Sequence, residues 1–121
     1  MDEPLKTNLN NKRKVGNKGE SKAVDYLLSI GYQILERNFY SRYGEIDIIA
    51  KDNTATVFVE VKLRNNDKYG KGLESISKRK ISSILKTAQA YLKNDDIDCR
   101  FDVISIDSDK IEHIISAFDA Y

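Results

Sequence analysis

The sequence lacks the residues on which disulfide-bonded, zinc-binding and histidine-dependent proteins rely. Cys99 is the only cysteine and His113 the only histidine among the 121 residues. A single cysteine excludes a disulfide framework and a cysteine-based zinc cluster, and it suits a reducing cytoplasm. A single histidine leaves a histidine-based metal site, such as that of an HNH-type nuclease, without its ligands. Phosphate-binding motifs of the P-loop and GxGxxG types are absent as well.

Long hydrophobic runs are also missing. No apolar stretch approaches the roughly 20 residues that a membrane-spanning helix needs, and the segment Met1-Asp2-Glu3-Pro4 has no signal-peptide character. We therefore expect a cytoplasmic protein without a membrane partner. A chain of 121 residues is long enough to bury a hydrophobic core without disulfide or metal staples, so a single domain is expected.

Positive charge is concentrated in parts of the chain, although the net charge is only +1. Residues 62–93 contain nine lysines or arginines and only two acids. A second basic group lies near the N-terminus, where residues 1–14 lack periodicity and are expected to form a flexible basic tail. Local positive fields attract polyanions even when the net charge is near zero, so nucleic acid is the expected partner. The alternative is a set of solvated lysines on a helix surface.

The hydrophobic pattern predicts one helix, three strands, a second helix and two further strands. The first helix is expected to begin at an N-cap at Asn17 and to end at Gly31, and the second to begin near Ser75 or Ser77 and to continue to residue 93. The predicted strands are residues 32–38, 45–50, 57–63, 98–106 and 111–118.

The connections between these elements predict the topology of the sheet. Short turns between the first three strands imply an antiparallel meander. The segment from residue 63 through the second helix to residue 98 is long enough for a right-handed parallel crossover. The expected fold is therefore a three-layer α/β domain over residues 15–121, in which helices flank a mixed five-stranded sheet in the order αβββαββ.

The strand at residues 57–63 carries an acid and a base on one face. Side chains alternate along a strand, so Val57, Val59, Val61 and Leu63 share one face, and Phe58, Glu60 and Lys62 share the other. Two residues of strand separate Glu60 from Lys62 by about 6.5 Å. The arrangement therefore holds a carboxylate and an ammonium side by side.

A second acid, Asp47, lies in the preceding strand. Alternation places it with Glu45 and Ile49 on one face, and Ile46, Ile48 and Ala50 on the other. An acid among aliphatic residues is costly to bury unless it is paired or binds a cation. If the two strands pair, two carboxylates and an ammonium converge, as metal-assisted phosphodiester hydrolysis requires. The alternative is a structural salt bridge between Asp47 and Lys62.

For three further charged residues the sequence leaves the orientation or the partner of the side chain open. Glu20 follows Asn17 by three residues and would complete a helix capping box, but it also shares a helix face with apolar residues and is equally expected to point at the sheet. Lys80 immediately precedes the apolar stripe of the second helix, so it faces either the site or solvent. Asp102 lies inside an apolar strand without an assigned partner. Because the ligands are oxygens of aspartate and glutamate, Mg²⁺ or Mn²⁺ is the expected metal.

These motifs resemble those of a known nuclease superfamily. Asp47 followed by Glu60-Val61-Lys62 is similar to the motif of the PD-(D/E)XK nucleases, with Ile46 in the position of the proline. In combination with further motifs, the chain resembles the YraN family of bacterial proteins over about residues 15–118. The segments that carry the resemblance are Gly19-Glu20, Gly44-Glu45-Ile46-Asp47, Val57-Phe58-Val59-Glu60-Val61-Lys62, Lys80 and Arg100-Phe101-Asp102-Val103-Ile104.

The resemblance implies a restriction-endonuclease-like core and assigns roles to its residues. Asp47, Glu60 and the backbone carbonyl of Val61 would bind the metal, and Lys62 would be the catalytic lysine. Glu20 is similar to a helix-borne glutamate of archaeal Holliday-junction resolvases. We expect a metal-dependent endonuclease that acts on branched or structured DNA, and the alternative is an inert module of the same fold that only binds nucleic acid. Junction-cutting relatives work as dimers, and the sequence leaves a homodimer open.

Two basic segments are expected to contact nucleic acid. The loop at residues 65–72 follows the Lys62 strand and therefore lies next to the predicted site, with a tyrosine that could stack on an unpaired base. The second helix supplies further cations. The expected contact residues are Lys68, Tyr69, Lys71, Lys78, Arg79, Lys80 and Lys86.

Overall fold

Seven elements make up the described part of the chain, in the predicted order of helix, three strands, helix and two strands. The helices are α1 (Asn11–Ser29) and α2 (Lys78–Leu92). The computed structural model describes residues 11–64, 76–93 and 98–118, and within α1 it describes side chains from Gly19 onward. The strands are β1 (Gln33–Ser41), β2 (Gly44–Asp52), β3 (Ala55–Arg64), β4 (Cys99–Asp107) and β5 (Lys110–Phe118).

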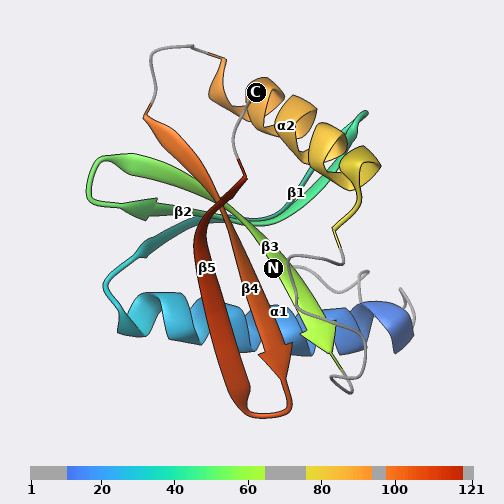
Figure 1. Ribbon diagram of the computed structural model, residues 1–121, viewed down its shortest axis with the longest axis vertical. Coiled ribbons are helices and arrows are strands. Elements are labelled where there is room, and N and C mark those ends of the chain that lie inside the picture. The colour runs from blue at the N-terminus through green and yellow to red at the C-terminus, as the bar shows by residue number, and fades with distance from the viewer. Residues whose placement is uncertain (1–10, 65–75, 94–97, 119–121) are drawn as a thin grey trace, which may run out of the picture.

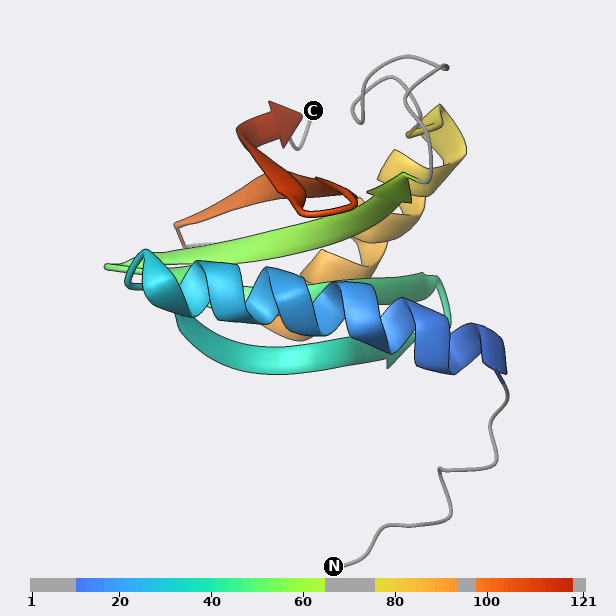
Figure 2. The same cartoon turned by 90° about the horizontal axis from the view of Figure 1, so that it is seen from below.

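The strands form one mixed sheet in the order β1-β2-β3-β4-β5 (Figure 1). β3 and β4 are parallel and are connected through α2, while every other neighbouring pair is antiparallel. α1 covers one face of the sheet and α2 the other (Figure 2). The predicted three-layer architecture of a restriction-endonuclease-like core is therefore confirmed. Neither described helix is long and apolar enough to cross a membrane.

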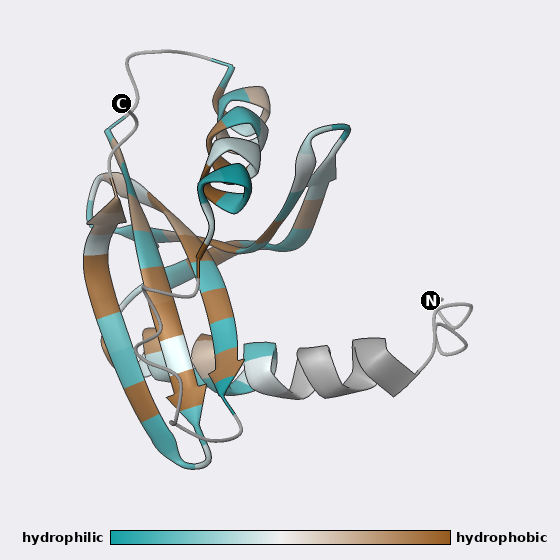
Figure 3. Ribbon diagram, turned by 45° about the vertical axis from the view of Figure 1, so that its right-hand side comes forward, coloured by the Kyte–Doolittle hydropathy of each residue, from teal (hydrophilic) through white to brown (hydrophobic). Residues whose placement is uncertain are grey.

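Alternation along β3 divides the hydrophobic core into two clusters, as the sequence predicts. Val57 and Val59 pack on the α1 side against Leu27. Phe58 packs on the α2 side against Ile84. The same alternation is visible as bands of hydrophilic and hydrophobic colour along the strands (Figure 3). Because β3 is covered on both faces, any polar side chain on it must find a partner inside the protein.

The N-terminal boundary of α1 differs from the prediction. The helix begins at Asn11 and passes through Asn17 without interruption, so the predicted N-cap and capping box are wrong. Lysine and arginine are good helix formers, and the polar character of residues 11–14 therefore does not stop the helix. The rest of the predicted tail, residues 1–10, lies outside the described residues. The predicted C-terminal end is confirmed, because Gly31 has a φ of 96° and the Tyr32 N–H donates to Leu27 O at 3.0 Å.

β2 separates from β3 halfway along its length. Its pairing with β3 runs only from Ile48 to Asp52, whereas its pairing with β1 continues to Gly44. The end of β1 and the start of β2 lean towards α2, while the end of β3 leans towards α1 (Figure 1). The bend also changes the predicted faces, because Ile46 packs with Ile49 on the α2 side instead of sharing the α1 side with Ile48. Asp47 lies at the point where the two strands part.

Candidate metal centre

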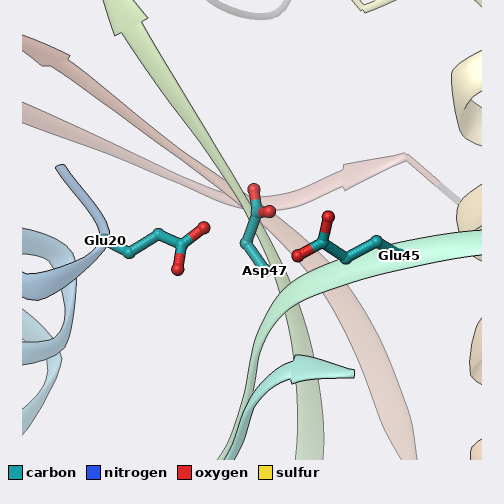
Figure 4. Close-up of side chains that lie close together, drawn as sticks. All are labelled: Glu20, Glu45 and Asp47. Carbon is teal, nitrogen blue, oxygen red and sulfur yellow. The ribbon is translucent and has the colours of Figure 1, made fainter. Parts of the chain in front are cut away.

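Three carboxylates from two elements meet where β2 and β3 separate. Glu20 comes from α1, and Glu45 and Asp47 come from β2. One oxygen of each carboxylate lies within 4.8 Å of the others. The carboxylates of Glu20 and Glu45 approach Asp47 from opposite sides (Figure 4). Asn38 of β1 links the outer two, since its Nδ2 donates to Glu20 Oε1 at 2.9 Å and to Glu45 Oε2 at 2.7 Å.

The separation of the strands explains the position of Asp47. Because the pairing of β2 with β3 begins only at Ile48, the N–H of Val61 has no backbone acceptor on β2. Asp47 supplies that acceptor, with its Oδ2 2.8 Å from Val61 N. Burial raises the pKa of the Asp47 carboxyl, and the charge of Glu45 raises it further against the hydrogen bond from Val61. The backbone thus fixes one oxygen of Asp47, and the site disfavours a negative charge on Asp47 in addition to that of Glu45.

Glu60 of β3 adjoins Asp47 of this cluster, and its pKa is the most strongly raised of these acids. Its side chain is buried, and its Oε1 has no hydrogen-bond partner in the described part of the protein. Its Oε2 lies 3.5 Å from Lys80 Nζ. Burial, followed by the negative charge of Asp47, raises the pKa of Glu60 from 4.5 to about 7, although Lys80 and Lys62 act in the opposite direction. Glu60 is therefore about half protonated at pH 7, and a further cation at the site would favour its ionised form.

Glu20 points into the cluster and does not cap a helix. Burial and the charge of Asp47 raise the pKa of its carboxyl, and the hydrogen bond from Asn38 opposes this increase. Arg37 places a cation nearby, with its Nη2 at 3.9 Å from Glu20 Oε1. Of the two predicted positions for Glu20, the structure has the one that faces the sheet.

Of the two predicted positions for Lys80, the structure has the one that faces the candidate site. α2 begins after Ser77, one of the two predicted caps, whose side chain accepts from Lys80 N at 3.1 Å. This start places Lys80 in the first turn, where it pairs with Glu60. Within the described residues Asp47 and Lys62 form no salt bridge, so the predicted structural ion pair between them is not observed. Lys62 is half-buried on the same face of β3 as Glu60.

Several predicted residues lie apart from the cluster. Lys78, Arg79 and Lys86 are exposed on α2. The predicted contacts Lys68, Tyr69 and Lys71 lie outside the described residues. The backbone carbonyl of Val61 stays a predicted ligand, since the contact that the structure gives is made by its N–H.

The prediction did not include two residues of the cluster. Glu45 had a usable signal, because it lies two residues before Asp47 and strand alternation already placed both on one face. Asn38 had none, because it is brought to the site by the pairing of β1 with β2 and by a backbone φ of 54°.

Asp102 provides an internal comparison, since it is a buried carboxylate whose partners are all present. Arg100 donates to it from Nε at 3.0 Å and from Nη2 at 3.1 Å, and Ser116 N donates at 3.1 Å. His113 Nε2 lies 2.7 Å from its Oδ2. Burial acts to raise the pKa of Asp102, but the hydrogen bonds from His113, Arg100 and Ser116 outweigh it and the pKa is lowered. At Glu20, Asp47 and Glu60, in contrast, the hydrogen bonds and nearby cations do not outweigh burial, and the pKa values are raised.

Comparisons with known proteins support the family resemblance of the sequence motifs over most of the chain. The family model described as "Uncharacterised protein family UPF0102" matches residues 19–106. A UPF0102 protein of Persephonella marina is 54% identical over 107 residues, which are 86% of this chain and 92% of that protein. A UPF0102 protein of a Sulfurihydrogenibium species is 48% identical, over 82% of this chain and 89% of its own. Another, from Thermodesulfovibrio yellowstonii, is 48% identical over 86% and 95% of the two chains.

Proposed function

The chain belongs to the uncharacterised protein family UPF0102, the YraN family, and from its carboxylate cluster we propose that it is a metal-dependent endonuclease that hydrolyses phosphodiester bonds in DNA. One observation carries the proposal: Glu60, buried beside Asp47, has an oxygen without a partner in the described part of the protein. A group in that state raises the free energy of the folded protein unless it is protonated or binds a cation.

The residues present suit a hard divalent cation. Asp47, Glu60, Glu20 and Glu45 offer only carboxylate oxygens, which Mg²⁺ and Mn²⁺ prefer. The raised pKa values of Glu20, Asp47 and Glu60 share two causes, burial and mutual repulsion. A divalent cation would offset both. When bound, such a cation polarises a phosphoryl oxygen and lowers the pKa of water.

The side chains around the cluster would perform the remaining steps. Lys80, 3.5 Å from Glu60, and Lys62, on the same face of β3, place positive charge where a phosphate would gain negative charge. Glu20 has a raised pKa and lies at the edge of the cluster, so it is suited to accept the proton of an attacking water. Asn38 holds Glu20 in the orientation that this step needs.

The experiment is a nuclease assay on a panel of DNAs. Purified protein is incubated with supercoiled plasmid, single-stranded, flap and four-way-junction substrates, with Mg²⁺, with Mn²⁺ or with EDTA. We expect cleavage with either metal, none with EDTA, and a loss of about 10²–10³-fold in Glu60→Ala. Glu112→Gln, at an exposed acid on β5, is the matched control and should retain activity. Cleavage that survives both EDTA and Glu60→Ala would come from a contaminant and would refute the proposal.

The salt bridge between Lys80 and Glu60 favours a second candidate function. In that case the chain binds DNA through α2 without cutting it, and the pair is structural. The two candidates differ in their response to metal. A nuclease centre should bind Mg²⁺ or Mn²⁺ in calorimetry and lose that binding in Glu60→Gln, whereas an inert module should show no metal binding in either protein.

A further inference from the structure

An exposed tyrosine lies at the tip of the turn that joins β1 and β2. Tyr43 is 44% exposed, a large fraction for an aromatic side chain with no role in the core. Two cations lie near its ring, with Arg42 Cζ at 5.4 Å and Lys86 Nζ at 5.8 Å from the centroid. Arg42 and Lys86 are also exposed. The turn thus presents an aromatic surface with positive charge around it.

The backbone of this turn is fixed on α2. Ser83 Oγ donates to Tyr43 O at 2.7 Å, and the hydroxyls of Ser41 and Thr87 lie 3.0 Å apart. The contact is close enough to require glycine at position 44, because a Cβ there would lie 2.1 Å from Ser83 Oγ. The backbone that carries the exposed tyrosine is therefore held in place, which lowers the entropy cost of binding a partner.

The surface around Tyr43 matches a polyanion. α2 carries four lysines or arginines and no acid. Three of these cations, Lys78, Arg79 and Lys80, lie in its first turn, where the positive end of the helix dipole disfavours them. Lys80 is accounted for by its ion pair with Glu60, whereas the positions of Lys78 and Arg79 are better explained by an anionic partner than by the stability of the helix. Lys80 reaches the carboxylate cluster, and Lys86, six residues later, reaches Tyr43, about 9 Å further along the helix.

We propose that Tyr43, with Arg42 and Lys86 beside it, binds an unpaired nucleobase of the DNA strand whose phosphodiester lies at the carboxylate cluster. The inference rests on the proposed nuclease function and adds the substrate class, which is duplex DNA that adjoins unpaired nucleotides. Stacking on an aromatic ring contributes about 5- to 150-fold in affinity per base, whereas a cation over an exposed ring contributes about two- to fivefold. A base therefore displaces one of the two cations, which then contacts a neighbouring phosphate.

The spacing along β2 predicts where the strand is cut. Four residues of extended chain separate Tyr43 from Asp47, or about 13 Å. A stacked strand advances about 3.4 Å per nucleotide, so this distance corresponds to about four nucleotides. Cleavage should fall about four nucleotides from the base that stacks on Tyr43.

The test measures DNA binding in EDTA, so that it does not depend on cleavage. Fluorescence anisotropy is followed with a single strand, a blunt duplex and a duplex that carries a single-stranded flap. Tyr43→Ala should weaken binding of the single strand and the flap by about 5- to 150-fold and leave the blunt duplex within about twofold. Tyr43→Phe, which keeps the ring, should bind like the natural protein. Circular dichroism melting checks that both variants are folded.

Charge variants separate stacking from attraction to phosphate. Lys86→Ala should weaken binding of all three DNAs and lower the slope of log K against log salt by about one. Lys110→Ala, at an exposed cation at the start of β5, is the control and should change neither quantity.

The outcomes distinguish this inference from the proposed function. If the protein cuts DNA and Tyr43→Ala binds the flap normally, or loses affinity equally for the blunt duplex, the inference is wrong and the nuclease proposal stands. If the natural protein binds none of the three DNAs, a protein or membrane partner is favoured and both proposals fail. Selective loss of flap binding in a protein that cuts nothing would support the site on an inert DNA-binding module.

Discussion

The stability of the metal-free protein should increase when Glu60 is replaced by glutamine. The pKa of Glu60 is about 7 in the folded protein and 4.5 in its unperturbed form, so the folded state binds more protons than the unfolded state between these values. The free energy of unfolding therefore falls as pH rises through that range. At about 1.4 kcal/mol per pKa unit, ionised Glu60 costs the folded protein about 3 kcal/mol above pH 8. Glutamine has nearly the same shape and no charge to ionise.

Urea unfolding followed by circular dichroism in EDTA provides the assay. At pH 4.5 Glu60→Gln and the natural protein should have nearly equal stability, and at pH 8.5 the variant should be more stable by about 3 kcal/mol. For a chain of this size that difference corresponds to roughly 12 °C in melting temperature. Loss of the ion pair with Lys80 offsets little of this gain, because the Lys80 side chain is 45% exposed. A variant equally or less stable at pH 8.5 would refute the reasoning, since Glu60 would then be a stabilising ion-pair partner.

Two other measurements follow from the same electrostatics. Asp102→Asn should cost about 3–5 kcal/mol at pH 7, because it breaks a buried charged network. Since the pKa of Asp102 is lowered, its contribution to stability should disappear as pH falls through the folded pKa, which is the opposite pH dependence to that of Glu60. Urea unfolding measures this dependence, and an equal loss of stability in Asp102→Asn at pH 7 and at pH 2 would contradict the prediction. Mg²⁺ affinity should increase from pH 6 to pH 8, with about one more proton released at pH 6. Calorimetry in buffers of different ionisation enthalpy measures both, and a pH-independent affinity would mean that Glu60 is not a ligand.

The strand pattern predicted the fold well because the determining interactions are local and periodic. Alternation in β3 assigns Val57 and Phe58 to opposite faces, and the two hydrophobic clusters follow it. The same pattern failed at Ile46, because the departure of β2 from β3 depends on which backbone groups pair and not on polarity. The start of α1 was also wrong, since a plausible N-cap such as Asn17 does not end a run of good helix formers.

Within the candidate site, the sequence allowed us to predict acidic residues but not the contacts that they make. Asp47 and Glu60 were identified because acids inside apolar strands need a partner. Two other features depend on contacts between elements that are distant in the sequence. Asn38 bridges Glu20 and Glu45, and Lys80, in place of Lys62, forms the ion pair with Glu60. Asp102 shows the limit of this argument, because it has the same local pattern as Asp47. Only its contacts with Arg100 and His113 show that its charge is already compensated.

The separation of β2 from β3 also has a consequence for motion. On the Gly44 side of Ile48, β2 pairs only with β1, and the turn of this hairpin is held by α2. On the other side of the separation, β3 continues beside β4. The two arms carry different proposed metal ligands, since Glu45 belongs to the hairpin and Glu60 to β3. The bond from Val61 N to Asp47 crosses between them and ends on a side chain. Where few hydrogen bonds cross, a protein opens at low free energy. The amide of Val61 should therefore exchange with solvent faster than that of Val59, and a cation shared by both arms would slow it.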